Sequence, residues 1–191
     1  MADAGRVIAG TARSIRLDAP GAGTRPLADR VKQTLFGILE PDIAGSRFLD
    51  LFAGSGAGGI EALSRGAAHA TFIERDATAV KVIRANLDRT GLAGDARATV
   101  IRGDVLAWLR DPVRGAAASY DLVLVDPPYD ETAILAAALE AVGPLLSPGA
   151  RVVAKHFWRT PPPAAVGLLA SDRERRLGDT ALTYYRRVED A

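Results

Sequence analysis

The tetrapeptide Asp-Pro-Pro-Tyr at residues 126–129 closes a continuous apolar run, Leu122–Val125. Such a run is typical of a strand buried on both faces, and two consecutive prolines end it. Because each proline fixes its own φ and restricts the residue before it, we expect Asp126 and Pro127 to be extended, with carbonyl oxygens free to accept hydrogen bonds. An Asp side chain and a backbone carbonyl placed in this way can accept both protons of an exocyclic amino group.

These two hydrogen bonds would change the reactivity of an aromatic amine. Such an amine is a poor nucleophile because its lone pair is delocalised into the ring. Holding both N–H bonds turns the lone pair toward an electrophile and stabilises the positive charge that develops during attack. Tyr129 would offer a flat ring on which the base can stack. A strand that ends in a surface proline turn explains Asp126, Pro127, Pro128 and Tyr129 equally well. A second motif is therefore needed to choose between the amine-binding and the structural interpretation.

That second motif is a glycine-rich turn, Gly54–Gly59, which follows an earlier predicted strand at residues 48–52. Glycines let the backbone approach a ligand closely, and the N-terminus of the helix that follows favours an anion. Glu74 ends the next predicted strand, where an acidic side chain can hold ribose hydroxyls. These features alone would also suit a dinucleotide.

Two carboxylates favour a different cofactor. Asp50 lies just before the turn, where it would sit poorly with a pyrophosphate but well with the ammonium group of a methionine moiety. Asp104, at the end of the third predicted strand, can accept from an adenine amino group or cap the next helix. Together these residues describe an S-adenosylmethionine pocket, whose sulfonium would present its methyl group to whatever residues 126–129 hold.

The elements that must position these motifs alternate along the chain. Strands are predicted at residues 48–52, 70–74, 98–102, 120–125 and 151–154, with helices between them and a closing hairpin over 173–177 and 181–188. Asp76 is expected to cap the helix that follows residues 70–74. Residues 161–163, three prolines, leave room for only a short helix. The pattern predicts a doubly wound, mostly parallel, seven-stranded Rossmann-like α/β sheet. If the fourth strand lies beside the first, where the strand order reverses, both motifs face one crevice.

The first 40 residues read as a small extension ahead of a catalytic domain at residues 41–191. We expect a hairpin over residues 6–17, a loop over 18–26, and a helix with Val31, Leu35, Ile38 and Leu39 on one stripe. Pro41 is expected to end that helix. Six basic and four acidic side chains give the extension a local charge of +2, which a solvated face of mixed charge would also explain.

Composition bounds the remaining possibilities. With 191 residues, 48% hydrophobic and 25% charged, the chain is expected to be one globular domain in which a net charge of +1 gives no general attraction to nucleic acid. The absence of cysteine excludes disulfides and thiolate metal sites and suits a reducing cytoplasm. The first residues lack a signal-peptide pattern, and the longest apolar stretch is too short to cross a bilayer. His69 and His156 lack metal-ligand spacing, so no metal is predicted.

Several segments resemble one known family, the bacterial methyltransferases that modify guanine N2 in small-subunit ribosomal RNA. They are FLDLFAGSG, GIEALSRGA, IERD, DLVLVDPPYD, the opening RVIAG and TRPLADRVKQTLFGIL, and GDTALTYY in the last hairpin. The resemblance covers most of the chain. Its DPPY and glycine motifs are shared by many amino-methyltransferases, whereas the N-terminal segment is more specific.

The resemblance implies site residues, which we name here by their place in this sequence. Asp126, Pro127, Pro128 and Tyr129 would hold and stack the guanine. The implied cofactor-binding residues are Asp50, Phe52, Ala53, Gly54, Ser55, Gly56, Glu74, Arg75, Asp104 and Val105. The implied RNA-binding residues are Arg13, Arg25, Arg30 and Lys32. The partner would be small-subunit ribosomal RNA or an assembled small-subunit particle, and the protein a cytoplasmic monomer. One departure is Lys155-His156, where such proteins often carry an acidic residue.

Other functions remain open on the sequence. An adenine-N6 methyltransferase on DNA or RNA, or a protein glutamine methyltransferase, would hold its amino group in the same way. A nicotinamide oxidoreductase would need a phosphate-compatible turn. A non-catalytic RNA-binding module would have the basic residues without methyl transfer.

Overall fold

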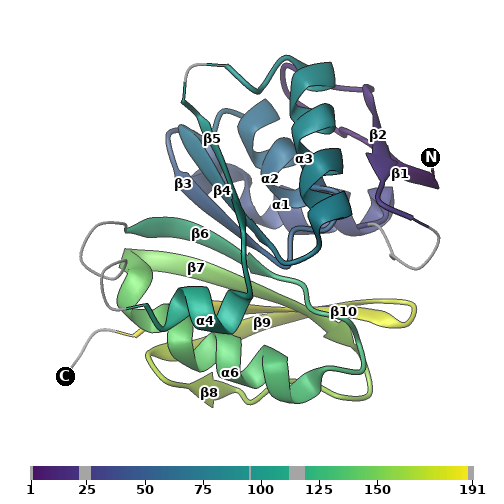
Figure 1. Ribbon diagram of the computed structural model, residues 1–191. Helices are drawn as coiled ribbons and strands as arrows, with labels where there is room; N and C mark the ends of the chain where they lie inside the picture. Colours follow the sequence, from purple (N-terminus) through teal and green to yellow (C-terminus); the bar gives the residue numbers. More distant parts are fainter. Residues whose placement is uncertain (1, 22–26, 95, 112–118, 189–191) are drawn as a thin grey trace.

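A single mixed sheet forms the centre of the computed structural model, which describes residues 2–21, 27–94, 96–111 and 119–188. Its strand order is β5-β4-β3-β6-β7-β10-β9-β8 (Figure 1). The strands are β3 (Arg47–Leu51), β4 (His69–Glu74), β5 (Ala98–Arg102), β6 (Tyr120–Val125), β7 (Leu146–Phe157), β8 (Ala165–Val166), β9 (Leu169–Leu177) and β10 (Thr180–Arg187). The five strands β3 to β7 run parallel to one another. Strand β10 pairs with β7 in the antiparallel direction.

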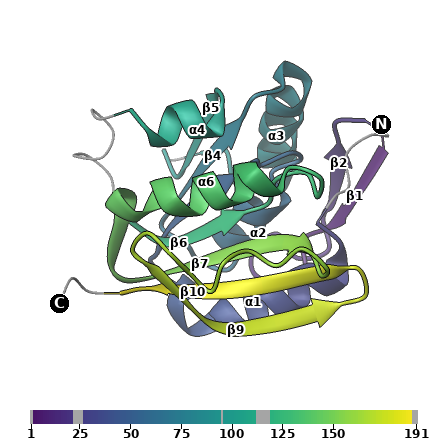
Figure 2. The ribbon, with the colours of Figure 1, turned by 90° about the horizontal axis from the view of Figure 1, so that it is seen from below.

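Helices cover both faces of this sheet (Figures 1 and 2). On one face lie α1 (Asp29–Ile43), α2 (Ala57–Ser64) and α3 (Ala77–Thr90), and on the other α4 (Val105–Leu109) and α6 (Thr132–Val142), which is followed by the 3-10 turn η1 (Gly143–Leu145). Each face has its own buried apolar cluster. The doubly wound fold is therefore confirmed. Besides the seven expected strands, the sheet carries the two-residue β8 where the sequence left room for a short helix.

Local chemistry explains why these elements begin and pack where they do. Asp76 and Asp104 cap α3 and α4, as expected, by accepting hydrogen bonds from the N–H groups of Ala79 (2.8 Å) and Ala107 (2.9 Å). Helix α2 lies so close to the sheet that a Cβ at Gly59 would be 2.3 Å from the Phe72 ring. Only glycine allows this approach, which brings the start of α2 to the ends of β3 and β6.

The N-terminal extension is bound firmly to α2 and α3. Its strands β1 (Ala2–Arg6) and β2 (Arg16–Ala19) pair in the antiparallel direction, slightly outside the predicted limits of the hairpin. The buried Glu61 on α2 accepts from the N–H groups of Ile8 (2.7 Å) and Ala9 (3.0 Å). The amide of Asn86 on α3 donates to the carbonyls of Asp18 and Ser55, both at 2.9 Å. The extension thus shares a core with the sheet, and its division from residues 41–191 stays a prediction.

Helix α1 differs from the sequence expectation at its end. Pro41 was expected to end the helix, but the last turn continues to Ile43, and Pro41 lies inside it. Ile43 is buried in the same core cluster as Leu35 and Leu39. Packing of this residue outweighs the one backbone hydrogen bond that a proline cannot make. Across the described ranges, no helix is both long and apolar enough to span a membrane.

Candidate active site

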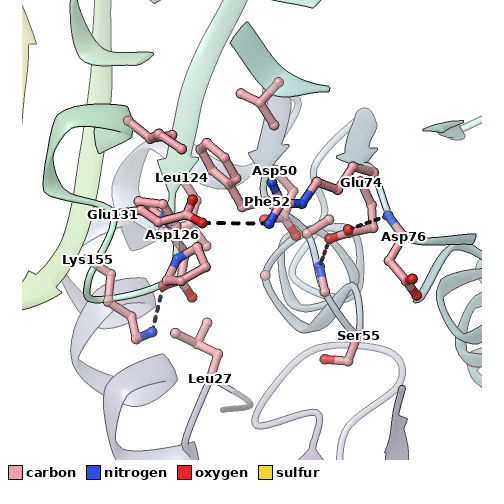
Figure 3. A pocket seen from close by; sticks show the side chains of 18 of the residues that line it. Leu27, Asp50, Phe52, Ser55, Glu74, Asp76, Leu124, Asp126, Glu131 and Lys155 are labelled. Carbon is pink, nitrogen blue, oxygen red and sulfur yellow. Dashed lines mark hydrogen bonds and ion pairs between the residues drawn. The ribbon is translucent and has the colours of Figure 1, made fainter. Parts of the chain in front are cut away.

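A pocket of about 650 Å³ opens at the carboxyl ends of the parallel strands (Figure 3). As expected, β6 lies beside β3, with Leu124 paired to Asp50 and Val125 to Leu51. This is the point where the strand order reverses, since β4 and β5 continue on one side and β7 on the other. The glycine turn after β3 and the segment after β6 therefore line one cavity.

The turn after β3 is held by its backbone conformation and by Glu74. Phe52, which is not a glycine, has a positive φ of 63°, and Gly54 has a φ of 55°. Such a conformation is costly for a residue with a side chain and is found most often at functional sites. The Glu74 carboxylate accepts from the N–H of Gly54 and from that of Asp76, each at 2.9 Å (Figure 3). It fixes the turn while its remaining lone pairs stay available.

Asp50 is a buried carboxyl group at the floor of the pocket. It accepts a hydrogen bond from the N–H of Gly59 at 2.7 Å. Burial raises its pKa to about 8, and the neighbouring Asp126 and Glu74 carboxylates act in the same direction against the hydrogen bond from Gly59. A cationic ligand group would stabilise the ionised form of this side chain.

The segment after β6 is fixed by Lys155 on β7. The Lys155 Nζ lies 2.6 Å from Oδ1 of Asp126 (Figure 3). It lies 4.8 Å from the centre of the Tyr129 ring. The Tyr129 hydroxyl is 2.5 Å from the Thr180 hydroxyl at the start of β10. Burial raises the pKa of Asp126, although Lys155 opposes that rise. Burial lowers the pKa of Lys155, but attraction to Asp126 and Tyr129 outweighs it, so that this pKa is raised.

The charges of the lining indicate the kind of ligand. Seven carboxyl side chains contribute to it, against two basic ones, Arg75 and Lys155. The seven are Asp50, Glu74, Asp76, Asp104, Asp126, Asp130 and Glu131. Such a wall would repel the pyrophosphate of a dinucleotide and attract a ligand that carries positive charge.

Comparison with known proteins identifies the family. The family described as "Conserved hypothetical protein 95" matches residues 5–186. The chain belongs to this family. YlbH of Bacillus subtilis (strain 168), named as a candidate rRNA methyltransferase, is 36% identical over 185 residues, or 95% of this chain and 98% of YlbH.

Two further similarities come from Escherichia coli. Ribosomal RNA small subunit methyltransferase D of strain K12 is 42% identical over 125 residues, which span 65% of this chain and 60% of that protein. The solved structure of a candidate methyltransferase, yhhF, superimposes with a TM-score of 0.81 at 34% identity, covering 97% of this chain and 98% of that one. The family resemblance seen in the sequence is thereby confirmed.

Most site residues expected from the resemblance to this family lie in the pocket. All four residues of the segment 126–129 line it, as do nine of the ten cofactor-binding candidates. The exception is Gly56, which caps α2 and packs against Ile83. Arg75 forms an ion pair of 3.6 Å with Glu131 across the pocket, joining the β4 end to the segment after β6. The contacts of these residues with a cofactor stay predictions.

The three described RNA-binding candidates, Arg13, Arg30 and Lys32, do not form one surface. The side chain of Lys32, for which the resemblance implied an RNA-binding role, is fully buried, and its ammonium group contacts the Arg6 carbonyl and the Asp29 carboxylate. Arg30 is exposed at the start of α1, three residues after Leu27 in the pocket lining. Arg13 is exposed but follows Ala12, which binds Ser64 at the far end of α2. Arg25 lies outside the described residues.

Some lining residues were missed in the sequence, above all Lys155. It was noticed only as a departure from the family pattern, although its place in an apolar strand, after Val152–Ala154, signals a buried charge that needs a partner. Also missed were Leu27, Ala57, Gly58, Asp76, Leu124, Asp130, Glu131 and Ile134. The histidines have structural partners: His69 contacts Thr99, and His156 contacts Thr183.

Proposed function

We propose that the chain transfers a methyl group from S-adenosylmethionine to the exocyclic N2 of a guanine in small-subunit ribosomal RNA. The observation that carries this proposal is one acidic pocket in which the segment 126–129 and the Gly54 turn meet. The names of the relatives support the substrate class, since both refer to rRNA methyltransferases and the Escherichia coli name specifies the small subunit.

The residues present fit this cofactor, which would supply a methyl group bound to a positively charged sulfur. Asp50 would pair with the ammonium group of the methionine moiety, and Glu74 would accept from ribose hydroxyls. Phe52 and Val105 offer apolar surface for the adenine, and Asp104 would accept from its amino group. An acidic lining suits this cation better than a dinucleotide phosphate.

The substrate amine would be held by the segment after β6. Asp126 and the carbonyl of Pro127 accept its two N–H groups, and Tyr129 stacks on the base while Thr180 fixes its hydroxyl. The target base must leave its stack to enter the pocket, as enzymes acting on bases generally require. After methylation the nitrogen loses a proton, which Asp126 accepts or passes to water.

The RNA would approach over the N-terminal extension. Arg30, three residues after Leu27 of the pocket lining, would contact phosphates close to the target nucleotide, and Arg13 would contact RNA only further away. Arg25 stays an RNA-binding candidate. We propose that the protein acts as a monomer. A ribosomal substrate would place it in the cytoplasm.

The experiment that tests this function uses methyl-labelled S-adenosylmethionine. The protein is incubated with small-subunit RNA, both free and in assembled particles, and the labelled nucleosides are identified. We expect N2-methylguanosine. Asp126→Asn should lower turnover by about a hundredfold or more, because the charge that stabilises the developing positive amine is lost, while cofactor affinity stays within about twofold.

Other outcomes would contradict the proposal in distinct ways. Label in N6-methyladenosine or in a protein glutamine would identify a different amine substrate. RNA binding without any methyl transfer would indicate a non-catalytic binding module. Equal turnover of the parent and Asp126→Asn would remove the role assigned to this carboxylate.

A further inference from the structure

The pocket contains a buried ammonium group that the proposed chemistry does not use. Lys155 is 7% exposed at its side chain, and Asp126 is 16% exposed. The two residues that Lys155 contacts, Asp126 at 2.6 Å and the Tyr129 ring at 4.8 Å, are those proposed to hold the amine and the base. The same group therefore touches both parts of the substrate-binding segment.

Lys155 is placed by the sheet and not by a loop. It pairs with Leu182 of β10, and its neighbours Ala154 and His156 are buried in β7. The segment 126–129, by contrast, follows the end of β6 as irregular backbone. The ammonium group thus connects a rigid strand to the start of an irregular segment.

A buried ion pair is weak evidence for a stabilising role. Removing two charges from water costs several kcal/mol per ion, and apolar side chains of similar size often stabilise a fold equally well. A role in substrate binding explains the Lys155–Asp126 ion pair better. The ion pair takes one of about four acceptor positions of the Asp126 carboxylate, so that positions for an amine remain.

We propose that Lys155 is a positioning residue, which holds the Asp126 carboxylate and the Tyr129 ring in the orientation that receives the target base. This inference rests on the proposed function, because it takes Asp126 and Tyr129 as the residues that hold the substrate. It adds a residue on a different strand to that machinery.

The electrostatics of the pocket support this role. The titratable and charged groups that line the pocket with Asp126 come from several elements. They are Asp50 from β3, Glu74 from β4, Arg75 and Asp76 after β4, Asp104 before α4, Lys155 from β7, and Tyr129, Asp130 and Glu131 from the segment of Asp126 itself. Burial raises the pKa of Asp126, and Lys155 is the cation that opposes this. Without Lys155, Asp126 would remain protonated to higher pH, and a protonated carboxyl group offers fewer acceptor positions to the amine.

The test compares Lys155→Met and Lys155→Arg with the parent in methyl transfer to the RNA substrate over a range of pH. Lys155→Met keeps the length of the side chain and removes its charge. We expect kcat/KM at neutral pH to fall by about tenfold to a hundredfold, and the acid limb of its pH profile to move to higher pH. Lys155→Arg should recover most of the activity and the position of the acid limb.

The matched control is Lys32→Met, which removes the other buried lysine that forms an ion pair with an Asp. It should lower the melting temperature without moving the acid limb. A Lys155→Met profile that coincides with that of the parent would overturn the inference. So would a uniform loss of activity at all pH values that Lys155→Arg does not recover, since this would mark a merely structural lysine.

A second measurement separates this inference from the proposed function. The pKa of the Asp126 carboxyl group can be followed by carbon NMR in the folded parent and in Lys155→Met, without any substrate. We expect a higher pKa in the variant, and an unchanged pKa would overturn the inference. A parent that never methylates guanine would contradict the proposed function, whatever this titration gives.

Discussion

At the scale of single residues, Asp50 is a group whose pKa is strongly altered by its surroundings. Most carboxylates in proteins are ionised at neutral pH, but burial raises the pKa of Asp50 to about 8. The Gly59 N–H alone does not offset the cost of burying the charge. The ionised form of Asp50 is therefore balanced by an opposite charge only when a cation binds beside this side chain.

This gives a prediction for cofactor binding as a function of pH. Below a pKa of about 8, a ligand ammonium must displace the proton of Asp50, so affinity should rise from about pH 6 to about pH 7.5. Above that range the amino group of the ligand begins to lose its own charge. Calorimetry with S-adenosylhomocysteine in buffers of different ionisation enthalpy would detect the released proton.

The variant for this prediction is Asp50→Asn, with Asp130→Asn at the exposed rim of the pocket as its control. Asp50→Asn should bind more weakly and lose the proton release and most of the pH dependence in this range. Asp130→Asn should keep both. An unchanged pH dependence in Asp50→Asn would show that another group is responsible.

At the scale of elements, the N-terminal extension and the helix α2 behave as one packed unit. A Cβ at Gly10 would lie 1.8 Å from the Ser64 carbonyl oxygen, so the extension rests directly on the end of this helix. Glu61, in the middle of α2, is fully buried and pairs with Arg65 at 2.7 Å in addition to its two backbone donors. The start of the same helix lines the pocket.

We therefore expect Glu61→Ala to lower the free energy of unfolding by about 3–5 kcal/mol, because it leaves the Arg65 charge and two N–H groups without their acceptor. Glu40→Ala is the matched control: Glu40 also pairs with Arg65, but its side chain is 58% exposed, so the loss should stay below about 1 kcal/mol. Urea denaturation measures both. Similar losses in the two variants would mean that the extension is only loosely attached.

The sequence predicted elements well where the signal is local. Leu122–Val125 predicted β6 because continuous burial leaves an apolar run, and Asp76 and Asp104 predicted the two helix starts because capping depends on neighbours in sequence. In parallel sheets, ligands bind at the carboxyl ends of the strands where the strand order reverses. From this rule the glycine turn and the segment 126–129 were expected to face one crevice, and the pairing of β3 with β6 confirms it.

Residues whose role depends on distant partners were predicted less well. Lys32 was placed among the RNA-binding residues by the family resemblance, yet it occupies the buried stripe with Phe36, Leu39 and Ile43, and this spacing is visible in the sequence. Its partners, the Arg6 carbonyl and Asp29, are brought there by folding. Lys155 was missed for the same reason, since its contact with Asp126 depends on the order of the strands.

At the scale of the whole molecule, an acidic pocket is set in a chain whose net charge is only +1. RNA attraction must therefore come from a few basic side chains, and the exposed Arg30 is the described candidate next to the pocket. Arg30→Ala should weaken RNA binding and lower the slope of log K against log salt by about 0.7 to 0.9. The exposed Arg84 on α3 provides the control, and Arg84→Ala should leave the slope unchanged. Equal slopes for parent and Arg30→Ala would remove Arg30 from the RNA surface.

The hydroxyl contact between Tyr129 and Thr180 links the site to β10, which the ribosome would synthesise after the other strands of the central sheet. Because synthesis runs from the N-terminus, the glycine turn and its neighbouring strands would leave the ribosome long before β10 does. Tyr129 would lack its anchor, and β7 its second neighbour, until that strand is in place. Because a domain generally folds as a unit, the site should become competent to methylate only after β10 has paired with β7.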